Sequence, residues 1–177
     1  MLRRVIVLRY GHRPKRDKRI STHLALVARA FGAHEIWFDS KDNKLERKLN
    51  QVNENFGGNF IVKTGVDWLE ALKNAKKMGW CIVHLTMYGL PLPQVIEKIR
   101  KEERNLLILV GGPKVPRVFF EIADYNVSIT NQPHSEVAAI AVFLDWFYSG
   151  REFDFKFEGA RLEIVPSERG KVVRVLR

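Results

Sequence analysis

Short apolar runs rich in β-branched residues alternate along this chain with segments whose apolar residues recur at helical spacing, almost as far as Gly150. The runs predict six strands, at residues 4–8, 35–38, 60–63, 80–85, 106–110 and 125–129. Strands that are separated by helices pair in parallel, and the helices then cover both faces of the sheet. The sequence therefore predicts an α/β fold with a mainly parallel six-stranded sheet and helices on both faces.

Caps and apolar stripes predict a helix after each strand. Ser21 or Thr22 is expected to cap the first helix, and Gly32 to end it, because glycine tolerates the left-handed closing conformation. The stripe that includes Leu45 and Leu49 predicts a second helix. Further helices are expected near residues 68–78, 93–101, 116–122 and 135–148.

The pattern changes after Gly150, where LEIVP and KVVRV flank the turn SERG and indicate an antiparallel hairpin. This segment is too short to bury a core of its own. We therefore divide the chain into a domain at residues 1–150 and a C-terminal β-hairpin extension at residues 151–177. The extension is expected to pair with the sheet, to pack on the helices or to join a second subunit.

The composition favours a polyanionic partner. The net charge is +10, and neutralising nucleic-acid phosphates releases counterions.

The sequence also indicates a reducing compartment. The single cysteine, Cys81, lies in the apolar run WCIVHL and is expected to be a buried thiol. No apolar run approaches the roughly 18 residues that a membrane helix needs, so a cytoplasmic protein is expected. The five histidines lack metal-ligand spacing, so no metal is expected.

Two segments late in the chain, LILVGGPKVP and ITNQPHSEVA, each predict a buried strand that runs into a loop. Ligands of open α/β sheets bind where the strands end. Gly111 and Gly112 would let the backbone approach a ligand closely, and Asn131 would offer an amide. However, strand-to-helix turns need such residues in any case, so the residues alone leave a ligand site and an ordinary turn equally open. A GxGxxG after the first strand, a GxxxxGK[ST] and a GxSxG are all absent from the sequence.

These two segments, together with VLRYGHRPKRDKRISTHLALVARAFGA near the start, resemble the knotted SPOUT methyltransferase superfamily. Within it, the chain is similar to the archaeal family of tRNA cytidine-56 ribose 2'-O-methyltransferases. The resemblance implies a C-terminal trefoil knot, a homodimer, S-adenosylmethionine as cofactor and the TΨC loop of tRNA as substrate. It places the cofactor against Leu85, Gly111, Gly112, Pro113, Lys114, Val115, Ile129, Thr130, Asn131, Gln132, Pro133, His134, Ser135 and Glu136.

The first loop is the expected RNA-binding surface. With the resemblance, its basic cluster favours contact with phosphates, although a charge run is often only a solvated surface. Tyr10 is expected to add stacking on an exposed base, as His12 is. The RNA-binding candidates are Arg9, His12, Arg13, Lys15, Arg16 and Lys18. The hairpin carries a second basic surface.

Related enzymes are thought to use an arginine of the first helix in catalysis, but that position is Leu26 here. We therefore expect Arg19 as the first catalytic candidate and Arg29 as the second, with Asp17 and His134 as further candidates. A surface salt bridge explains Arg29 equally well. Free arginine is a poor base, so its role would be electrostatic or would need help from an RNA phosphate.

Three other functions stay open. A knotted methyltransferase could act on another RNA nucleotide or on a base. A protein of the same fold could bind RNA without catalysis, although intact Gly111, Gly112, Asn131 and Ser135 argue against decay of the pocket. A small-molecule α/β protein is disfavoured by the basic charge.

Overall fold

The computed structural model describes residues 3–112 and 114–176. Six parallel strands form one sheet in the order β3-β2-β1-β5-β4-β6, which confirms the predicted fold class. The strands are β1 (Val5–Tyr10), β2 (Glu35–Phe38), β3 (Ile61–Thr64), β4 (Cys81–Pro91), β5 (Leu106–Gly111) and β6 (Tyr125–Ser128).

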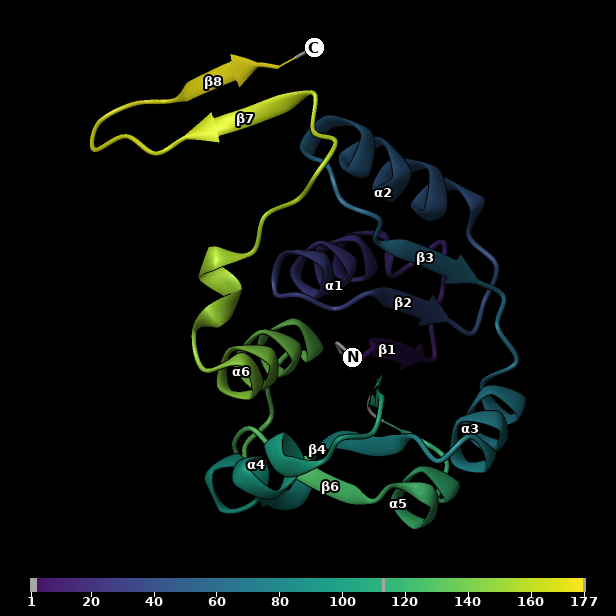
Figure 1. The fold of residues 1–177 in the computed structure, drawn as a ribbon. Coiled ribbons are helices and arrows are strands. Elements are labelled where there is room, and N and C mark those ends of the chain that lie inside the picture. The colour runs from purple at the N-terminus through teal and green to yellow at the C-terminus, as the bar shows by residue number, and fades with distance from the viewer. Residues whose placement is uncertain (1–2, 113, 177) are drawn as a thin grey trace.

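Helices cover both faces of this sheet (Figure 1). They are α1 (Lys18–Ala30), α2 (Asn43–Phe56), α3 (Trp68–Lys77), α4 (Leu92–Lys101), α5 (Val118–Ile122) and α6 (Glu136–Tyr148). The apolar residues of α1, α2, α4 and α6 share one core cluster, and those of α3 and α5 share the other. Neighbouring residues of a strand point to opposite faces, so Val7 joins the first cluster and Leu8 the second. This two-sided burial explains why the central strands are continuous apolar runs.

The start of α1 differs from the prediction. The helix begins at Lys18, with Asp17 as the capping residue, rather than at Ser21 or Thr22. Ser21 lies inside the first turn, is fully buried and bonds the side chains of Arg9 and His12. The predicted cap was wrong because this hydroxyl serves a tertiary network instead of the helix terminus.

Strand β4 is longer and less regular than predicted. It continues beyond Leu85 to Pro91, and both Leu85 and Leu90 pair with Val127 of β6. The four intervening residues, 86–89, therefore bulge out of the ladder with β6. We call this segment the β4 bulge.

The chain after α6 forms the predicted antiparallel hairpin. A short 3-10 helix, η1 (Arg151–Asp154), and a linker at residues 155–161 lead to β7 (Leu162–Val165) and β8 (Val172–Val175). Figure 1 shows the hairpin standing apart from the sheet, near α2. The backbone N–H of Arg161 donates to the carbonyl of Asn55 in α2 at 3.0 Å. Within the described chain, no helix is long and apolar enough to cross a membrane.

Candidate functional site

The loops predicted to hold a cofactor lie together at one edge of the sheet. β4 pairs in parallel with both β5 and β6, so the segments that follow these three strands emerge side by side. Leu85 is buried at this edge, Gly111 and Gly112 are half-buried, and the residues from Thr130 to Ser135 are exposed. Lys114 is also exposed, Val115 and Ile129 are half-buried, and Pro113 lies outside the described residues.

The two glycines after β5 differ in the space around them. A Cβ atom on Gly111 would lie 2.4 Å from Cγ1 of Val115, so no side chain fits there without moving the loop. A Cβ atom on Gly112 would meet nothing within 4 Å among the described residues. Gly111 is therefore explained by the folding of its own loop, whereas Gly112 lies beside open space that a ligand could use.

The β4 bulge joins the loop after β6. The side-chain amide of Asn131 donates to the carbonyl oxygens of Met87, at 2.6 Å, and Gly89, at 3.2 Å. A Cβ atom on Gly89 would lie 2.5 Å from backbone atoms of Asn126 and Val127, so only glycine allows this approach. Sequence reasoning missed this part of the site, and the only local indication was a glycine just after an apolar run.

The loop before α6 is also ordered by its own side chains. The Ser135 hydroxyl accepts the N–H of Val137 at 3.1 Å, which confirms that Ser135 caps this helix. The ring Nδ1 of His134 lies 2.7 Å from the carbonyl oxygen of Gln132. Because a carbonyl only accepts, this Nδ1 carries a proton, and in the neutral ring Nε2 is an acceptor.

Arg9 connects this loop to the first one. Its guanidinium lies 3.5 Å from Asp17, 3.2 Å from the Ser21 hydroxyl and 3.4 Å from Glu136 in the first turn of α6. The Arg9 side chain is 4 % exposed and that of Glu136 is 14 % exposed. The Nε of Arg9 and the Oε1 of Glu136 are buried and have no hydrogen-bond partner among the described residues. This network ties the start of α1 to the start of α6.

Burial removes the support for two predicted RNA-binding residues. Arg9 is enclosed by the acidic network, and the ring of His12 is bound between the Ser21 hydroxyl, at 2.8 Å, and Asp42, at 3.1 Å. Burial therefore argues against direct RNA contact by Arg9 and His12. Tyr10 is also engaged, because its ring packs edge-on against Trp68 and Phe119.

The other basic residues of the first loop and of the start of α1 are exposed, as an RNA-contacting surface requires. They are Arg13, Lys15, Arg16, Lys18 and Arg19. Arg13 is partly engaged, since it donates to Asp17 at 3.1 and 3.2 Å. Burial opposes ionisation of Asp17, but the hydrogen bonds from Arg13 and the charges of Arg9 and Arg13 outweigh it, so the pKa of Asp17 is lowered. Asp17 is thus an ionised anchor of the loop and a poor proton acceptor.

Arg29 lies far from these loops, in the last turn of α1, and it is buried. It donates to Asn53 Oδ1 at 3.0 Å and to the Gly57 carbonyl at 2.6 Å, and its guanidinium stacks 4.5 Å from the centre of the Phe157 ring. The distance from the cofactor loops argues against a catalytic role for Arg29, and its burial excludes a surface salt bridge. The arginine instead holds the end of α2 and the linker.

Cys81 is buried as predicted, and burial raises its pKa to about 12, so the thiol stays protonated. Among residues 3–112 and 114–176, no group of three or more His, Cys, Asp or Glu side chains could hold a metal ion.

Comparison with known proteins connects this geometry to an enzyme family. The family described as "tRNA ribose 2'-O-methyltransferase, aTrm56" matches residues 56–174. A tRNA (cytidine(56)-2'-O)-methyltransferase of Staphylothermus marinus is 54% identical over 97% of this chain and 92% of its own length. A protein of the same name from Thermoplasma volcanium is 55% identical over 97% of this chain, which spans only 50% of that relative.

Solved structures with low sequence identity share the fold. A TrmH/SpoU tRNA modifying enzyme of A. aeolicus superposes with a TM-score of 0.65 and 15% identity, covering 86% of this chain and 78% of that one. The SpoU methyltransferase AviRb of Streptomyces viridochromogenes, in complex with AdoMet, gives a TM-score of 0.56 and 15% identity over 84% of this chain and 58% of that one. Both similarities concern the arrangement of the elements.

Proposed function

This chain belongs to the family of tRNA ribose 2'-O-methyltransferases described as aTrm56, and on that premise we propose that it methylates the 2'-hydroxyl of cytidine 56 in the TΨC loop of tRNA. The observation that carries this proposal is the similarity to relatives named for that reaction, over nearly the whole chain. The convergence of the loops after β4, β5 and β6 supports it, because this edge is where open α/β sheets bind ligands.

We further propose S-adenosylmethionine as the cofactor. The residues at the loop edge fit its adenosine part: Leu85, Val115 and Ile129 offer apolar walls, and Gly112 leaves open space beside the backbone. The buried Oε1 of Glu136, which has no partner in the described part of the chain, is an acceptor at the same edge. When bound, S-adenosylmethionine would supply an electrophilic methyl group to the ribose hydroxyl.

Arg19 remains our catalytic candidate. It is exposed in the first turn of α1, the turn that Arg9 ties to the start of α6. A guanidinium is not a base at neutral pH, so Arg19 would orient the ribose and stabilise the negative charge that develops on the 2'-oxygen. An RNA phosphate or His134 Nε2, which is an acceptor in the neutral ring, would then take the proton.

Two features support the knot and the homodimer that the family implies. The β4 bulge contacts the chain where it leaves β6, through the Asn131 bonds and the close approach of Gly89, which is consistent with a knot at this point. Apolar side chains of α6 and of η1 are exposed, with Trp146 40% and Phe153 79% accessible. A second subunit would cover them.

The proposal is tested by incubating the protein with an unmodified tRNA transcript and labelled S-adenosylmethionine, and then mapping the label by nuclease digestion and mass analysis. We expect label on the ribose of cytidine 56. Label on a base or at another nucleotide would keep the methyl transfer and overturn the substrate. Binding of tRNA without any label would favour an RNA-binding protein.

Arg19→Ala sharpens the test. We expect this variant to lose transfer by at least about a hundredfold while its affinity for S-adenosylmethionine stays nearly unchanged, because an electrostatic contact to the reacting oxygen is lost. Single-turnover kinetics and calorimetry measure the two quantities. Normal turnover by Arg19→Ala would remove the residue from the mechanism.

Gly112→Ala tests the cofactor pocket independently. The added methyl fits the free protein, so unfolding should be unchanged while binding of S-adenosylmethionine weakens. Unchanged binding in calorimetry would remove Gly112 from the pocket.

A further inference from the structure

A second hollow lies at the opposite edge of the sheet, between the main domain and the linker of the extension. Its volume is about 710 Å³, within the range of small-molecule sites. It is lined by residues that precede β1, β2 and β3 and by the ends of α1, α4 and α6. The 13 residues of α1 span roughly 20 Å, so this hollow is remote from the cofactor loops. We call it the linker cavity.

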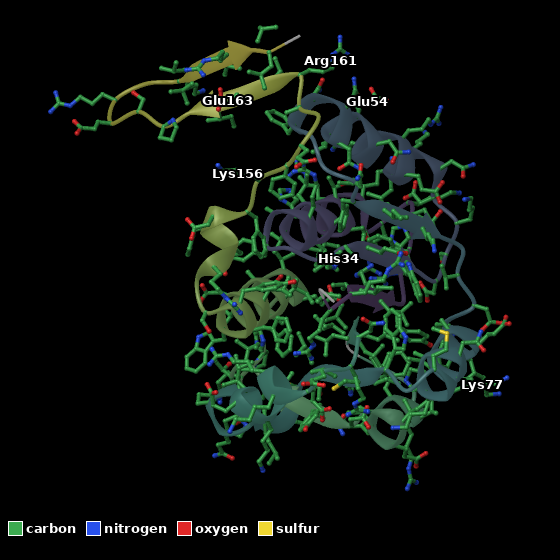
Figure 2. All side chains as sticks on the ribbon, viewed as in Figure 1. His34, Glu54, Lys77, Lys156, Arg161 and Glu163 are labelled. Carbon is green, nitrogen blue, oxygen red and sulfur yellow. The ribbon has the colours of Figure 1, made fainter. Side chains whose placement is uncertain are left out.

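The lining of the linker cavity is strongly cationic. Its cations are Arg3, Arg29, Arg100, Arg151 and Lys156, of which Arg100 pairs with Glu97 outside the lining, and Glu158 is its only carboxylate among the described residues. Figure 2 labels His34 on the main domain and Lys156 on the linker. Such an excess of positive charge around a partly enclosed volume attracts an anion.

Arg29 shows that this charge is not balanced internally. Its side chain is buried, yet no carboxylate lies within 4.0 Å of it in the described part of the chain. Burial lowers the pKa of Arg29. Lys156 is exposed and makes no ion pair with any described residue. A ligand with negative charge would supply what both cations lack.

His34 adds a directed hydrogen-bond donor. Its Nδ1 accepts the N–H of Val5 at 3.0 Å, so the neutral ring carries its proton on Nε2. Burial lowers the pKa of His34, which favours this neutral form. The imidazole is therefore oriented by the backbone and presents an N–H to a ligand.

Aromatic rings form the other walls. Phe147, Tyr148, Phe155 and Phe157 all line the cavity. Two of these rings hold each other in place: Tyr148 donates its hydroxyl to the Gly32 carbonyl at 2.7 Å and packs edge-on against Phe155, 5.0 Å away. A Cβ atom on Gly32 would lie 2.2 Å from the Phe155 ring, so this glycine permits the seating of the linker. Aromatic walls beside cations suit a group that carries both a flat ring and a phosphate.

We propose that the linker cavity binds a nucleotide, with its phosphate among Arg29, Arg151 and Lys156 and its base against the aromatic walls. The nucleotide is either a unit of a bound RNA or a free mononucleotide, since the same chemistry recognises both. The inference does not rest on methyl transfer, because binding here needs neither the cofactor nor turnover.

The test uses uridine 5'-monophosphate, which has no adenine and therefore does not report on an S-adenosylmethionine site. Calorimetry measures its affinity, and NMR follows the ring signals of His34. We expect saturable binding with a shift of those signals. Lys156→Glu should weaken the affinity by about tenfold or more, since it removes a charge-assisted contact and adds repulsion. Lys77→Glu is the matched control, because Lys77 is an exposed lysine on α3, away from the linker (Figure 2), and should stay within about twofold.

The same variants measured against a tRNA transcript separate the two sources. If Lys156→Glu also weakens tRNA binding relative to Lys77→Glu, the nucleotide belongs to RNA, and if only uridine monophosphate is affected, it is free. Equal affinities of both variants for both probes would overturn the proposal. It would also be overturned if the His34 signals changed with protein concentration alone, because a second subunit would then fill the cavity.

Discussion

The side chain of Arg9, from β1, lies at the start of α1, and Arg29 lies in the last turn of α1. Both are buried, but their charges are neutralised differently. Arg9 faces the carboxylates of Asp17 and Glu136, at 3.5 and 3.4 Å. Arg29 faces an amide oxygen, a carbonyl oxygen and the ring of Phe157. A buried charge needs compensation, and ion pairs and neutral dipoles supply it with different consequences. The end with the ion pairs is closed around its arginine, whereas the end without them has an open cationic cavity.

The largest effect is expected for Arg9→Met. The substitution keeps the apolar stem but leaves Asp17 and Glu136 partly unpaired in a buried place, which should lower the free energy of unfolding by about 3–5 kcal/mol. Urea unfolding measures it. The double variant Arg9→Met/Glu136→Gln should recover part of the loss, because a neutral amide replaces the stranded carboxylate. No recovery would mean that Arg9 acts through packing alone.

Arg29→Met should lower the free energy of unfolding by less, about 1–2 kcal/mol. It removes the bonds to Asn53 and Gly57 and the stacking on Phe157. It also removes a buried charge that no carboxylate of residues 3–112 and 114–176 neutralises. The same urea experiment compares the two variants directly. If Arg29→Met were as damaging as Arg9→Met, the presence or absence of carboxylates would not be what distinguishes the two ends.

Features that neighbouring residues specify could be predicted from the sequence, whereas contacts between distant segments could not. The strands were predictable because each central strand is buried on both faces and is therefore a continuous apolar run. The loops after β5 and β6 were predictable because glycine, proline and a capping serine mark them locally, and the cap at Ser135 is confirmed.

The burial of Arg9 and His12 was not predictable from the basic run that contains them. Their partners, Glu136 and Asp42, come from other segments, and nothing local marks those contacts. The cap of α1 failed for the same reason, since Ser21 is used by this network. The β4 bulge and the linker cavity depend on how distant segments approach one another, so the sequence pattern did not reveal them.

The smallest effect on stability at neutral pH is expected for Arg13→Ala, at the start of α1 beside the buried Arg9. Arg13 also pairs with Asp17, but its side chain is 56% exposed, so solvent screening limits the loss of stability at pH 7 to about 0–1 kcal/mol. Arg16→Ala is the matched control, because Arg16 is exposed in the same loop and makes no ion pair with any described residue. It should leave the free energy of unfolding unchanged.

The pH dependence of the free energy of unfolding distinguishes Arg13 from Arg16 more clearly. The pKa of Asp17 is lowered in the folded protein, so its ionisation stabilises the fold above the ordinary aspartate pKa, and that contribution is lost as the pH falls through the lowered value. Without Arg13 the folded pKa rises toward the ordinary value, and the dependence on pH in this acidic window should flatten. Urea unfolding between about pH 2 and 5 measures the slope for the parent, Arg13→Ala and Arg16→Ala. Identical slopes in all three would mean that Arg9 alone sets the ionisation of Asp17, and the closed end would then depend on its buried arginine and not on the exposed one.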